Sequence, residues 1–540
     1  MILSSIPSIR VWPFFTNSGS EAVECALKTA RKYHHANGQP ERIEIYGFDG
    51  SFHGRTYGAI NAAGNPNYVE GFGPRLPGYS QLTFGDHEAI KAAIAKPDTA
   101  AIILEPVQGE GGARSVPEVC LRGLRELCDA HGVLIIFDEV QCGMGRTGKL
   151  FAHEWAGIEP DVLATAKALD AAVDSFLASP SAEGLQAAKD AWLAARVPYQ
   201  QTEAYRFGNA IVDDWEGKVN AWPLDEGLID YVDASYGGAT DENAAAALNV
   251  IANPTFTLSG TEVDASTITP DFLAETLHEA DGNEANVASG YHAVEFLLWG
   301  QDLNGTEHGA GGRDWTDYAT GDDCTNDNCD RRGQYLKAAA DLIVTDLEYM
   351  VAQWAEGGAA RTNLTDNEDG AISAMLTGMG SLSYGELAGE RMRLGLMLND
   401  PEEEHDCFSD NTHNSHYYDG LGIQNVYLGA YARTDGTLVT GPSLSDLVAA
   451  ENADLDAEMQ LNLSTTMRKL GQIKTAAEAG MSYDQMMARG NKGGEALVMG
   501  GVNALIAQTK TIERVVATLG VDDVAIEGSD SLDSPGAVFE

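Results

Sequence analysis

Thr165-Ala166-Lys167-Ala168-Leu169 is the stretch at which this chain changes character. Before it lie short apolar runs that end in polar or Gly-rich turns, and after it lies a long acidic chain with apolar residues at helical spacing. Residues 1–169 carry 15 Lys and Arg against 19 Asp and Glu, whereas the remaining residues carry 19 against 62. The net charge is −4 before this seam and −43 after it, so we predict two domains, 1–169 and 170–540.

The bulk composition excludes some classes of protein. The 540 residues are 44% hydrophobic, which is enough for real cores in more than one domain. No apolar run is long enough to span a bilayer, so no transmembrane segment is expected. The acidic second part should be repelled by nucleic acid and by anionic membranes. A solvated surface, as in a salty habitat or an exported protein, is the simplest explanation of its charge.

The cysteines also divide at the seam. Four of them lie before it, in segments patterned like buried helices and strands, which is typical of a reduced cytosolic protein. Cys324 and Cys329 lie in the polar loop CTNDNC, which suits a small disulfide of an exported protein, and Cys407 follows. Residues 1–15 do not have the pattern of a secretion signal. The two parts therefore indicate different compartments, cytoplasm and cell envelope, and the localisation stays open.

The first part has the pattern of a parallel α/β sheet. Apolar runs end in polar residues, and helical patterns lie between them. We predict strands at Phe14–Asn17, Ile43–Phe48, Ala100–Leu104 and Val133–Phe137, and helices at Ser18–Tyr33 and Leu121–His131. In such a sheet the functional site lies at the carboxyl ends of the strands. Ser18-Gly19-Ser20-Glu21 could hold an anion at the helix start, or it could simply be a capping box.

Five motifs in this part carry a family resemblance. They are FFTNSGSEAVECALKTAR, FHGRT, LEPVQGEGG, FDEVQCGMGRTGKLFAHE and PDVLATAKAL, in this order over residues 14–169. Together they resemble the class III pyridoxal-phosphate aminotransferases of the acetylornithine and ornithine type. The resemblance implies part of the large domain of a fold-type-I enzyme.

The resemblance also implies a role in cofactor binding for six residues. Lys167 would form the Schiff base, Asp138 would pair with the pyridinium nitrogen, Gln141 would lie near the ring hydroxyl, Phe52 would stack on the ring, and Gly19 and Ser20 would hold the phosphate. Singly, Asp138 could be a turn residue and Phe52 a core residue. The family continues after its lysine with a further strand and a small domain, and this chain does not. We therefore expect a truncated fragment with a vestigial Lys167, and pyridoxal phosphate only if the fragment is competent.

The second part is patterned as helices. Apolar residues recur at three- and four-residue spacing, and long loops rich in Gly, Asp and Asn separate the segments. The predicted helices are Ala182–Ala195, Pro198–Val212, Leu336–Trp354, Gly385–Leu396, Leu444–Leu463 and Glu495–Leu519. Strand signals are nearly absent, so we predict an all-α architecture with more than one bundle.

The most informative stretch of this part is Ala285–Gly300, which is apolar nearly all round and should form a buried helix. His292 and Glu295 are three residues apart and so share one face of it. A buried Glu must be paired, protonated or bound to a cation, and a neutral imidazole beside a carboxylate suits a transition metal. The alternative is a core ion pair that fixes helix packing. The spacing is not H-E-x-x-H, so a zinc-protease geometry is not specified.

GYHAVEFLLWGQDLN resembles the G-x-H-x-x-E signature of the imelysin family, near its iron-regulated protein A branch. WLAARVPYQQTEAYRF, WPLDEGLIDYV, GAGGRDWTDY, GMGSLSYGELAGERM and DPEEEHDCFSDNTHNSHYYDGLGIQNVYLG extend the resemblance over residues 170–520. It implies two helical bundles that divide near residue 360, an exported protein linked to iron supply, and His292 and Glu295 as ligands of iron or another divalent metal. Partners in envelope iron uptake are also implied. Some members have been described as metal-dependent, insulin-cleaving peptidases.

A second polar cluster follows at Glu402-Glu403-Glu404-His405, Asp410, His413 and His416. It could be a solvated loop, or it could approach the His292 helix and complete the site. We add Glu404, His405, Asp410 and His413 to the candidate metal ligands. Further polar candidates, which could instead be buried salt-bridge partners, are Arg313, Asp317, Glu390 and Arg391. Trp222–Glu226 has the pattern of a structural turn.

Three hypotheses follow for the chain. The first is an imelysin-like, iron-linked metal-binding protein that carries an inactive aminotransferase fragment and is not itself an enzyme. The second is a metallopeptidase of the imelysin type, and the third is a pyridoxal-phosphate aminotransferase acting through Lys167. The two resemblances meet without a linker, which is typical of a recombination or of a sequence-assembly error.

Overall fold

The computed structural model describes residues 18–36, 38–142, 161–236, 238, 243–355, 357–365, 368–434, 436 and 438–539. The chain forms two compact units, Met1–Pro160 and Asp161–Glu540. The boundary differs from the predicted residue 169, because residues 161–169 are the first turns of a helix in the second unit. The predicted strand Phe14–Asn17 lies outside the described residues.

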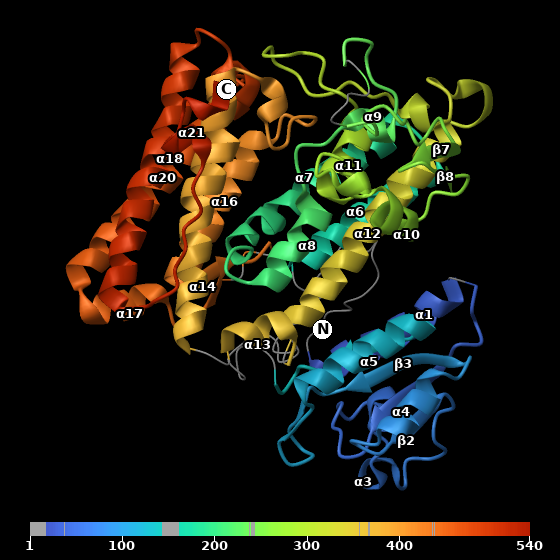
Figure 1. The fold of residues 1–540 in the computed structure, drawn as a ribbon. Coiled ribbons are helices and arrows are strands. Elements are labelled where there is room, and N and C mark those ends of the chain that lie inside the picture. Colours follow the sequence, from blue (N-terminus) through green and yellow to red (C-terminus); the bar gives the residue numbers. More distant parts are fainter. Residues whose placement is uncertain are drawn as a thin grey trace. The chain divides into compact units, whose positions relative to one another are not determined.

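The first unit contains a parallel four-stranded sheet in its described part (Figure 1). Its strands, in spatial order, are β2 (Tyr79–Leu82), β1 (Glu44–Phe48), β3 (Thr99–Leu104) and β6 (Leu134–Phe137). Three of them match predicted strands. The short β2 was not predicted because polar Ser80 and Gln81 interrupt its apolar pattern, and its side chains are only half-buried.

Helices cover both faces of this sheet. Side chains alternate along a strand, so Ile45 and Ile103 pack with α1 (Gly19–Ala36) and α2 (Tyr57–Ala63) on one face. Tyr46 and Ile102 pack on the other face with α4 (His87–Ile94) and α5 (Glu118–His131). The remaining short elements are α3 (Pro66–Val69), β4 (Val107–Gln108) and β5 (Arg114–Ser115). The predicted α/β fragment is confirmed.

The second unit is mainly helical, as predicted. Its first core joins α6 (Asp161–Ala178), α7 (Ala182–Gln200), α8 (Ala210–Asn220), α11 (Gly290–Trp299) and α12 (Cys329–Trp354). Trp192, Phe296 and Tyr335 are among its fully buried side chains. Shorter elements around this core are α9 (Glu226–Ile229), the hairpin β7 (Thr255–Leu258) and β8 (Thr261–Asp264), α10 (Pro270–Phe272) and α13 (Ala359–Thr365).

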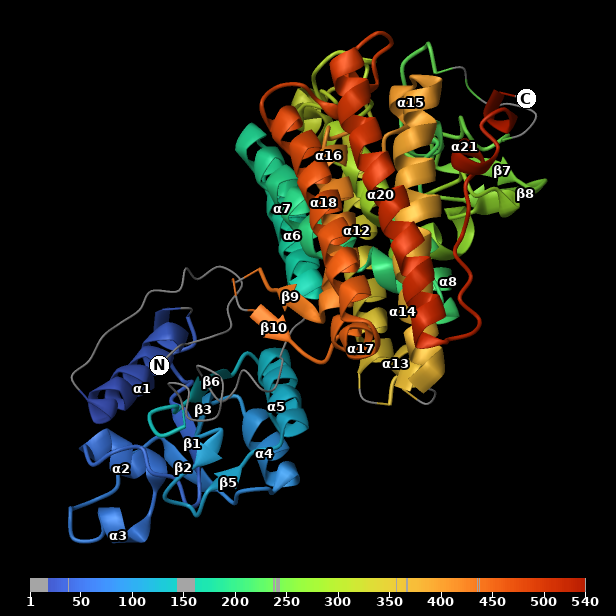
Figure 2. The same cartoon turned by 90° about the vertical axis from the view of Figure 1, so that its left-hand side faces the viewer.

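The rest of this unit forms two further cores, which centre on Met379 and Met392. Figure 2 shows α18 (Ala453–Glu478) and α20 (Lys492–Leu519) side by side along these cores. Other helices are α14 (Glu368–Ser381), which continues through a π-type stretch at Leu382–Leu394 into α15 (Gly395–Leu398), and α16 (Thr412–Leu428), α17 (Leu444–Glu451), α19 (Tyr483–Met487) and α21 (Asp530–Asp533). A small hairpin pairs β9 (Ala430–Ala432) with β10 (Leu438–Thr440).

Two predicted helices are broken in the structure. The run Pro198–Val212 divides because Gly208 has a φ of +81° and Asn209 precedes the start of α8. The run Leu444–Leu463 divides at Asn452, whose side chain accepts a hydrogen bond from the Leu455 N–H and caps α18. Local capping chemistry therefore overrides the apolar period at both places.

The predicted disulfide is present between Cys324 and Cys329, just where α12 begins. Cys407 is a free, half-buried thiol. Among the helices that the structure describes, none combines the length and the apolar character needed to cross a membrane.

Candidate functional site

The helix α11 carries the central residues of the candidate site and is buried along its whole length. It begins at Gly290, which has a φ of +83°. A Cβ on this glycine would lie 2.5 Å from the carbonyl oxygen of Val219, at the end of α8. Only glycine permits this backbone angle together with so close an approach. The glycine of the G-x-H-x-x-E pattern therefore lets α11 pack directly against α8.

His292 and Glu295 lie on the same face of α11 and contact each other. The Nδ1 atom of His292 is 3.0 Å from Oε2 of Glu295. The other oxygen of Glu295 accepts hydrogen bonds from the backbone N–H and the hydroxyl of Ser409, at 3.0 and 2.6 Å. The Nε2 atom of His292 is buried and has no hydrogen-bond partner among the described residues. One ring nitrogen is thus oriented by a carboxylate, and the other is left with unused bonding capacity.

The loop before α16 brings His405 and Asp406 to this helix. The rings of His292 and His405 lie edge to face with their centroids 4.8 Å apart. His292, His405 and Asp406 each offer one ligand atom, and these atoms all lie within 4.8 Å of one another. We call these three residues the histidine–aspartate centre. Its three side chains are at most 1% exposed.

Arg196 on α7 is the main partner of Asp406. Its guanidinium donates to the two carboxylate oxygens at 2.6 and 3.4 Å, and Asn411 donates to one of them at 2.7 Å. Burial by itself would raise the pKa of Asp406, but Arg196 and then His405 hold this pKa well below its ordinary value. Asp406 is therefore an anion at neutral pH.

The two histidines of the centre are neutral at neutral pH. Burial lowers the pKa of His292 and of His405 well below the ordinary value, and the nearby positive charge of Arg196 lowers both further. Burial raises the pKa of Glu295, and the charge of Asp406 raises it further. Neutral imidazoles beside an anionic carboxylate are the ligand forms that metal ions bind.

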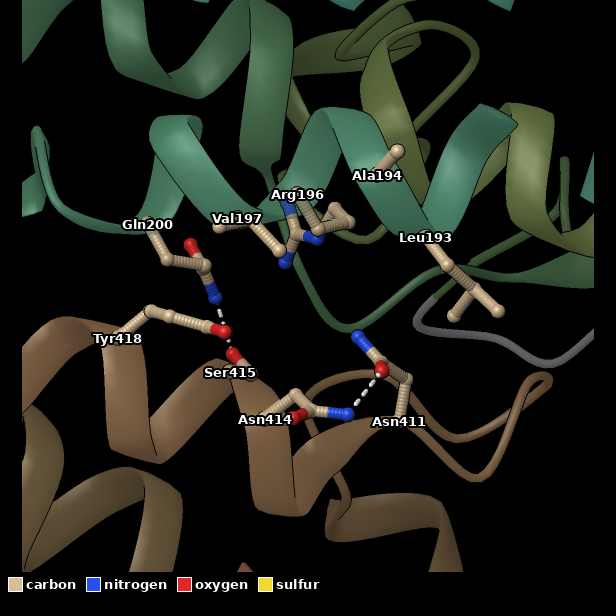
Figure 3. Close-up of a pocket in the computed structure, with 9 residues that line it drawn as sticks. All are labelled: Leu193, Ala194, Arg196, Val197, Gln200, Asn411, Asn414, Ser415 and Tyr418. Carbon is tan, nitrogen blue, oxygen red and sulfur yellow. Dashed lines mark hydrogen bonds between the residues drawn. The ribbon is translucent and has the colours of Figure 1, made fainter. Parts of the chain in front are cut away.

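A pocket of about 270 Å³ opens beside the centre (Figure 3). Arg196 and Gln200 on α7 line one wall, and Asn411 and Ser415 line the facing wall. The hydroxyl of Ser415 is 2.8 Å from Nδ1 of His405, and Nε2 of Gln200 is 3.4 Å from the same atom. The pocket wall therefore reaches the buried centre, although the pocket is too small for a folded or extended peptide chain.

The other predicted ligands do not join this centre. Glu404 and Asp410 lie in a separate group of carboxylates with Asp302 and Asp484. His413 is 3.0 Å from the Asn414 side chain, and burial lowers its pKa to about 4. The ring of His416 packs edge to face on Tyr483, and burial lowers its pKa to about 3. The predicted cluster thus does not stay together: His405 joins the centre, Glu404 and Asp410 join the carboxylates, and the two remaining histidines lie in neither group.

The remaining polar candidates belong to salt bridges or to the helix surface. Arg313 bonds Asp230 and Asp317 at 2.7 and 3.2 Å, all nearly without exposure. Arg391 bonds Glu203 at 2.8 Å and Asp419 at 3.1 Å, also with buried partners. Glu390 is half-buried in the π-type stretch. Trp222, in the predicted turn before α9, packs edge to face on His405.

Sequence reasoning missed three residues that shape the centre: Asp406, Arg196 and Ser409. Asp406 directly follows a residue that was predicted. Arg196 is a lone charge in the apolar run Trp192–Tyr199, and such a residue must find a buried partner. That signal was available, although its partner could not be named from spacing. Ser409 carries no sequence signal of its own.

In the first unit, four predicted cofactor residues lie where β1, β3 and β6 end. Nδ1 of His53 is 2.7 Å from Oδ2 of Asp138, which is buried after β6. A Cβ on Gly19 would meet Val140, and Ser20 lies against Gly54, so the start of α1 faces the same strand ends. The Phe52 N–H donates to Glu105 at 2.9 Å, and the ring of Phe52 packs on Tyr68.

Two other cofactor residues differ from this placement. Gln141 is exposed, and its side chain lies against Gly109. Lys167 is not on a strand of the sheet, because it lies in α6 of the second unit, where its Nζ is 3.1 Å from Oε1 of Glu348. The structure therefore does not group the expected Schiff-base lysine with the unit that contains Asp138.

Comparisons with known proteins agree with this division. The family model described as Imelysin matches residues 160–512, and the model described as Aminotransferase class-III matches residues 4–176. Acetylornithine aminotransferase 2 of Caulobacter vibrioides is 83% identical over 157 residues, which are 29% of this chain and 39% of that protein. Acetylornithine aminotransferase of Mesorhizobium japonicum is 60% identical over 156 residues, with the same coverage of 29% and 39%. The chain thus spans about two fifths of the length of these curated relatives.

Two solved structures are also similar. A structure described as an iron-regulated protein A precursor from Parabacteroides distasonis is 19% identical, covers 66% of this chain and 90% of its own, and has a TM-score of 0.48. An (S)-enantioselective omega-transaminase from Thermomicrobium roseum is 38% identical, covers 27% of this chain and 37% of its own, and has a TM-score of 0.25.

The larger unit is an all-helical domain built around a buried G-x-H-x-x-E helix. The chain belongs to the imelysin family, because the family model matches more than half of its length. The residues before this domain are a fragment of a class III aminotransferase. Both resemblances seen in the sequence are confirmed.

Proposed function

We propose that the helical unit is a metal-binding protein, with the histidine–aspartate centre as its site and ferrous iron as its cargo. The observation that carries this proposal is that Nε2 of His292 is buried without a partner among the described residues, in a group of three side chains whose ligand atoms lie within 4.8 Å of one another. A buried polar atom without a partner is costly, and a metal ion would satisfy it. Two imidazoles and one carboxylate, with positions left open, form a donor set that suits Fe(II).

Glu295 and Arg196 hold the ligands in place. The contact of Glu295 with Nδ1 of His292 leaves Nε2 for the metal, as carboxylates commonly do behind ligating histidines. Arg196 and Asn411 fix the Asp406 carboxylate: Oδ2 accepts from both of them, whereas Oδ1 accepts from Arg196 and keeps a second lone pair for an ion. The pocket beside Ser415 and Gln200 gives the ion a route from solvent.

A metallopeptidase is the second candidate and is less well supported. Glu295 is a buried carboxylate in direct contact with the proposed metal ligand His292, which is where a general base would lie. However, Ser409 and His292 already occupy both of its oxygens, and the adjoining pocket has no room for a peptide. Metal binding without proteolysis therefore accounts for more of the geometry.

We infer that the aminotransferase fragment does not act as a transaminase. Pyridoxal phosphate supplies an electron sink only when a lysine of the same site holds it. Lys167 lies instead in a helix of the other unit and pairs with Glu348. Its expected companions Asp138 and Phe52 bond residues of the first unit. The described residues that the resemblance assigns to the cofactor are thus divided between two units.

Export to the cell envelope and a partner in iron uptake are further parts of this proposal. The Cys324–Cys329 disulfide supports an oxidising compartment. The net negative charge attracts cations and repels nucleic acid and anionic lipid, which agrees with a protein that binds metal ions.

The test is an anaerobic titration of the full chain with Fe(II), in which calorimetry measures the binding. We expect saturable binding that His292→Ala weakens at least a hundredfold, since it removes the unpartnered ligand atom. The control is His35→Ala, an exposed histidine at the end of α1, which should bind as the wild type does. Equal binding by the wild type and His292→Ala would refute the site, and no binding in either would make the pair a packing feature.

A further inference from the structure

A second group of acidic side chains lies apart from the histidine–aspartate centre. Asp302 is in the loop after α11, Asp410 is in the loop before α16, and Asp484 is in α19. Each offers one carboxylate oxygen, and the three oxygens all lie within 4.8 Å of one another. We call these residues the tri-aspartate cluster. Three segments that are far apart in the sequence therefore converge on one point.

Glu404 points into the tri-aspartate cluster from the same loop as Asp410. It is 0% exposed, and neither of its oxygens meets hydrogen-bond geometry with a donor of the described chain. Its carboxyl group is within hydrogen-bonding reach of the Asp484 carboxyl. The fourth carboxyl group is thus fully buried and without a compensating partner.

No basic side chain neutralises this group in the part of the chain that the structure describes. Neither Asp302, Glu404 nor Asp484 forms an ion pair with Lys or Arg, and Asp410 is only 3.9 Å from Nδ1 of the exposed His308. The existing contacts come from neutral donors: Asn304 donates to Asp302, and the Gly309 N–H donates to Asp410. Carboxylates crowded out of water must either take up protons or bind a cation.

We propose that Asp302, Asp410 and Asp484, together with Glu404, form a second cation site that takes Ca²⁺. The donors are all oxygens, which hard cations prefer, whereas the first centre offers imidazole nitrogen. Oxygens that share one calcium ion lie at most about 4.8 Å apart, given bond lengths of about 2.4 Å, and the three aspartate oxygens lie within that distance of one another. Donors from three separate segments form an irregular set, which Ca²⁺ accepts more readily than the strictly octahedral Mg²⁺ does.

Such an ion would connect the two parts of the helical unit. Asp302 follows α11 of the first core, whereas Asp484 belongs to α19, whose neighbours Tyr483 and Met486 lie in the last core. Because the cluster joins these cores only in the folded chain, calcium would bind the native state alone and stabilise it. The site is therefore structural, and it is independent of iron binding at His292.

The experiment is calorimetric Ca²⁺ titration of the chelator-treated full chain at pH 8, together with thermal unfolding with and without Ca²⁺. We expect one saturable Ca²⁺ site, a higher melting temperature with Ca²⁺, and a response to Mg²⁺ at least tenfold weaker. Asp484→Asn should weaken Ca²⁺ binding at least tenfold, and so should Asp302→Asn, which is less buried and less demanding for folding. Asp323→Asn, in an exposed turn, is the matched control and should bind normally.

His292→Ala separates this proposal from the iron proposal, since it should lose Fe(II) and keep Ca²⁺. The calcium site is overturned if the wild type shows no saturable Ca²⁺ binding. It is also overturned if folded Asp302→Asn binds as tightly as the wild type. A third result would also overturn it: Asp302→Asn melts at a higher temperature than the wild type, and Ca²⁺ changes the melting temperature of neither protein. The carboxyl groups would then be protonated and would not bind an ion.

Discussion

At the scale of single residues, the candidate site depends on the contact between His292 and Glu295, whose side chains lie on one face of α11. The helical period alone places them on one face. The partners Arg196, Asp406 and Ser409 come from other segments of the chain, and no local pattern names them. A candidate ligand can therefore be found from one helix, whereas the set of ligands depends on which loops the fold brings to that helix.

Gly290 gives the first prediction at this scale. Gly290→Ala should lower the free energy of unfolding by roughly 2–4 kcal/mol, because alanine at a φ of +83° is strained and its Cβ would meet the Val219 carbonyl. Gly305→Ala is the control, since Gly305 also has a positive φ, +60°, but no atom within 4 Å of an added Cβ. Its loss should be about 1 kcal/mol. Urea unfolding measures both, and equal losses would mean that the close approach to α8 is unimportant.

Asp346 on α12 gives a prediction about pH. Burial raises its pKa to about 6, and Lys218 offsets this only in part. Between about pH 4 and 6 the unfolded chain loses this proton while the folded chain keeps it, so stability falls as pH rises through that window. Asp346→Asn should remove this loss, on the order of 1–2 kcal/mol after allowance for its partial exposure.

The measurement is urea unfolding of the wild type and of Asp346→Asn at pH 4.5 and pH 7. The free energy of unfolding of the variant, relative to that of the wild type, should be higher at pH 7 than at pH 4.5. Glu348→Gln, two residues further along on the exposed side of α12, should show no such change. A difference that stays constant with pH would show that Asp346 titrates normally.

At the scale of elements, α6 shows how context decides structure. Residues 160–169 fall within the match to the aminotransferase family model, yet from Asp161 onward they form a helix of the imelysin unit. Leu163, Ala166 and Leu169 are buried in the first core of that unit, and this packing stabilises the helix. A family resemblance therefore indicates ancestry here more reliably than it indicates local structure.

This placement of Lys167 gives a prediction. The full chain treated with pyridoxal phosphate and borohydride should show no preferential labelling of Lys167 over other exposed lysines, because it lies in a helix of the second unit and pairs with Glu348. Lys167→Ala should leave the melting temperature almost unchanged, since an exposed pair with Glu348 is worth about 0–1 kcal/mol. Peptide mass spectrometry provides the readout, with Lys189 as the internal comparison. Stoichiometric labelling of Lys167 alone would restore the aminotransferase hypothesis.

At the scale of the whole molecule, the sequence predicts both fold classes and most helices, because apolar periods and strand-end turns are local signals. The same signals fail at Gly208 and Asn452, where a left-handed turn and a cap break longer runs. They also fail to separate Glu404 from His405, which adjoin in sequence but serve different groups of side chains. Such separation depends on long-range packing, which one sequence does not contain.

The position of the boundary also bears on the history of the gene. The two family matches overlap over residues 160–176, so the letters of α6 belong to both ancestries. A later deletion of the aminotransferase letters through Leu169 would remove three side chains from the first core of the helical unit. Only a deletion that stops before Asp161 would spare that core. The first core of the helical unit thus depends on residues that both family models match.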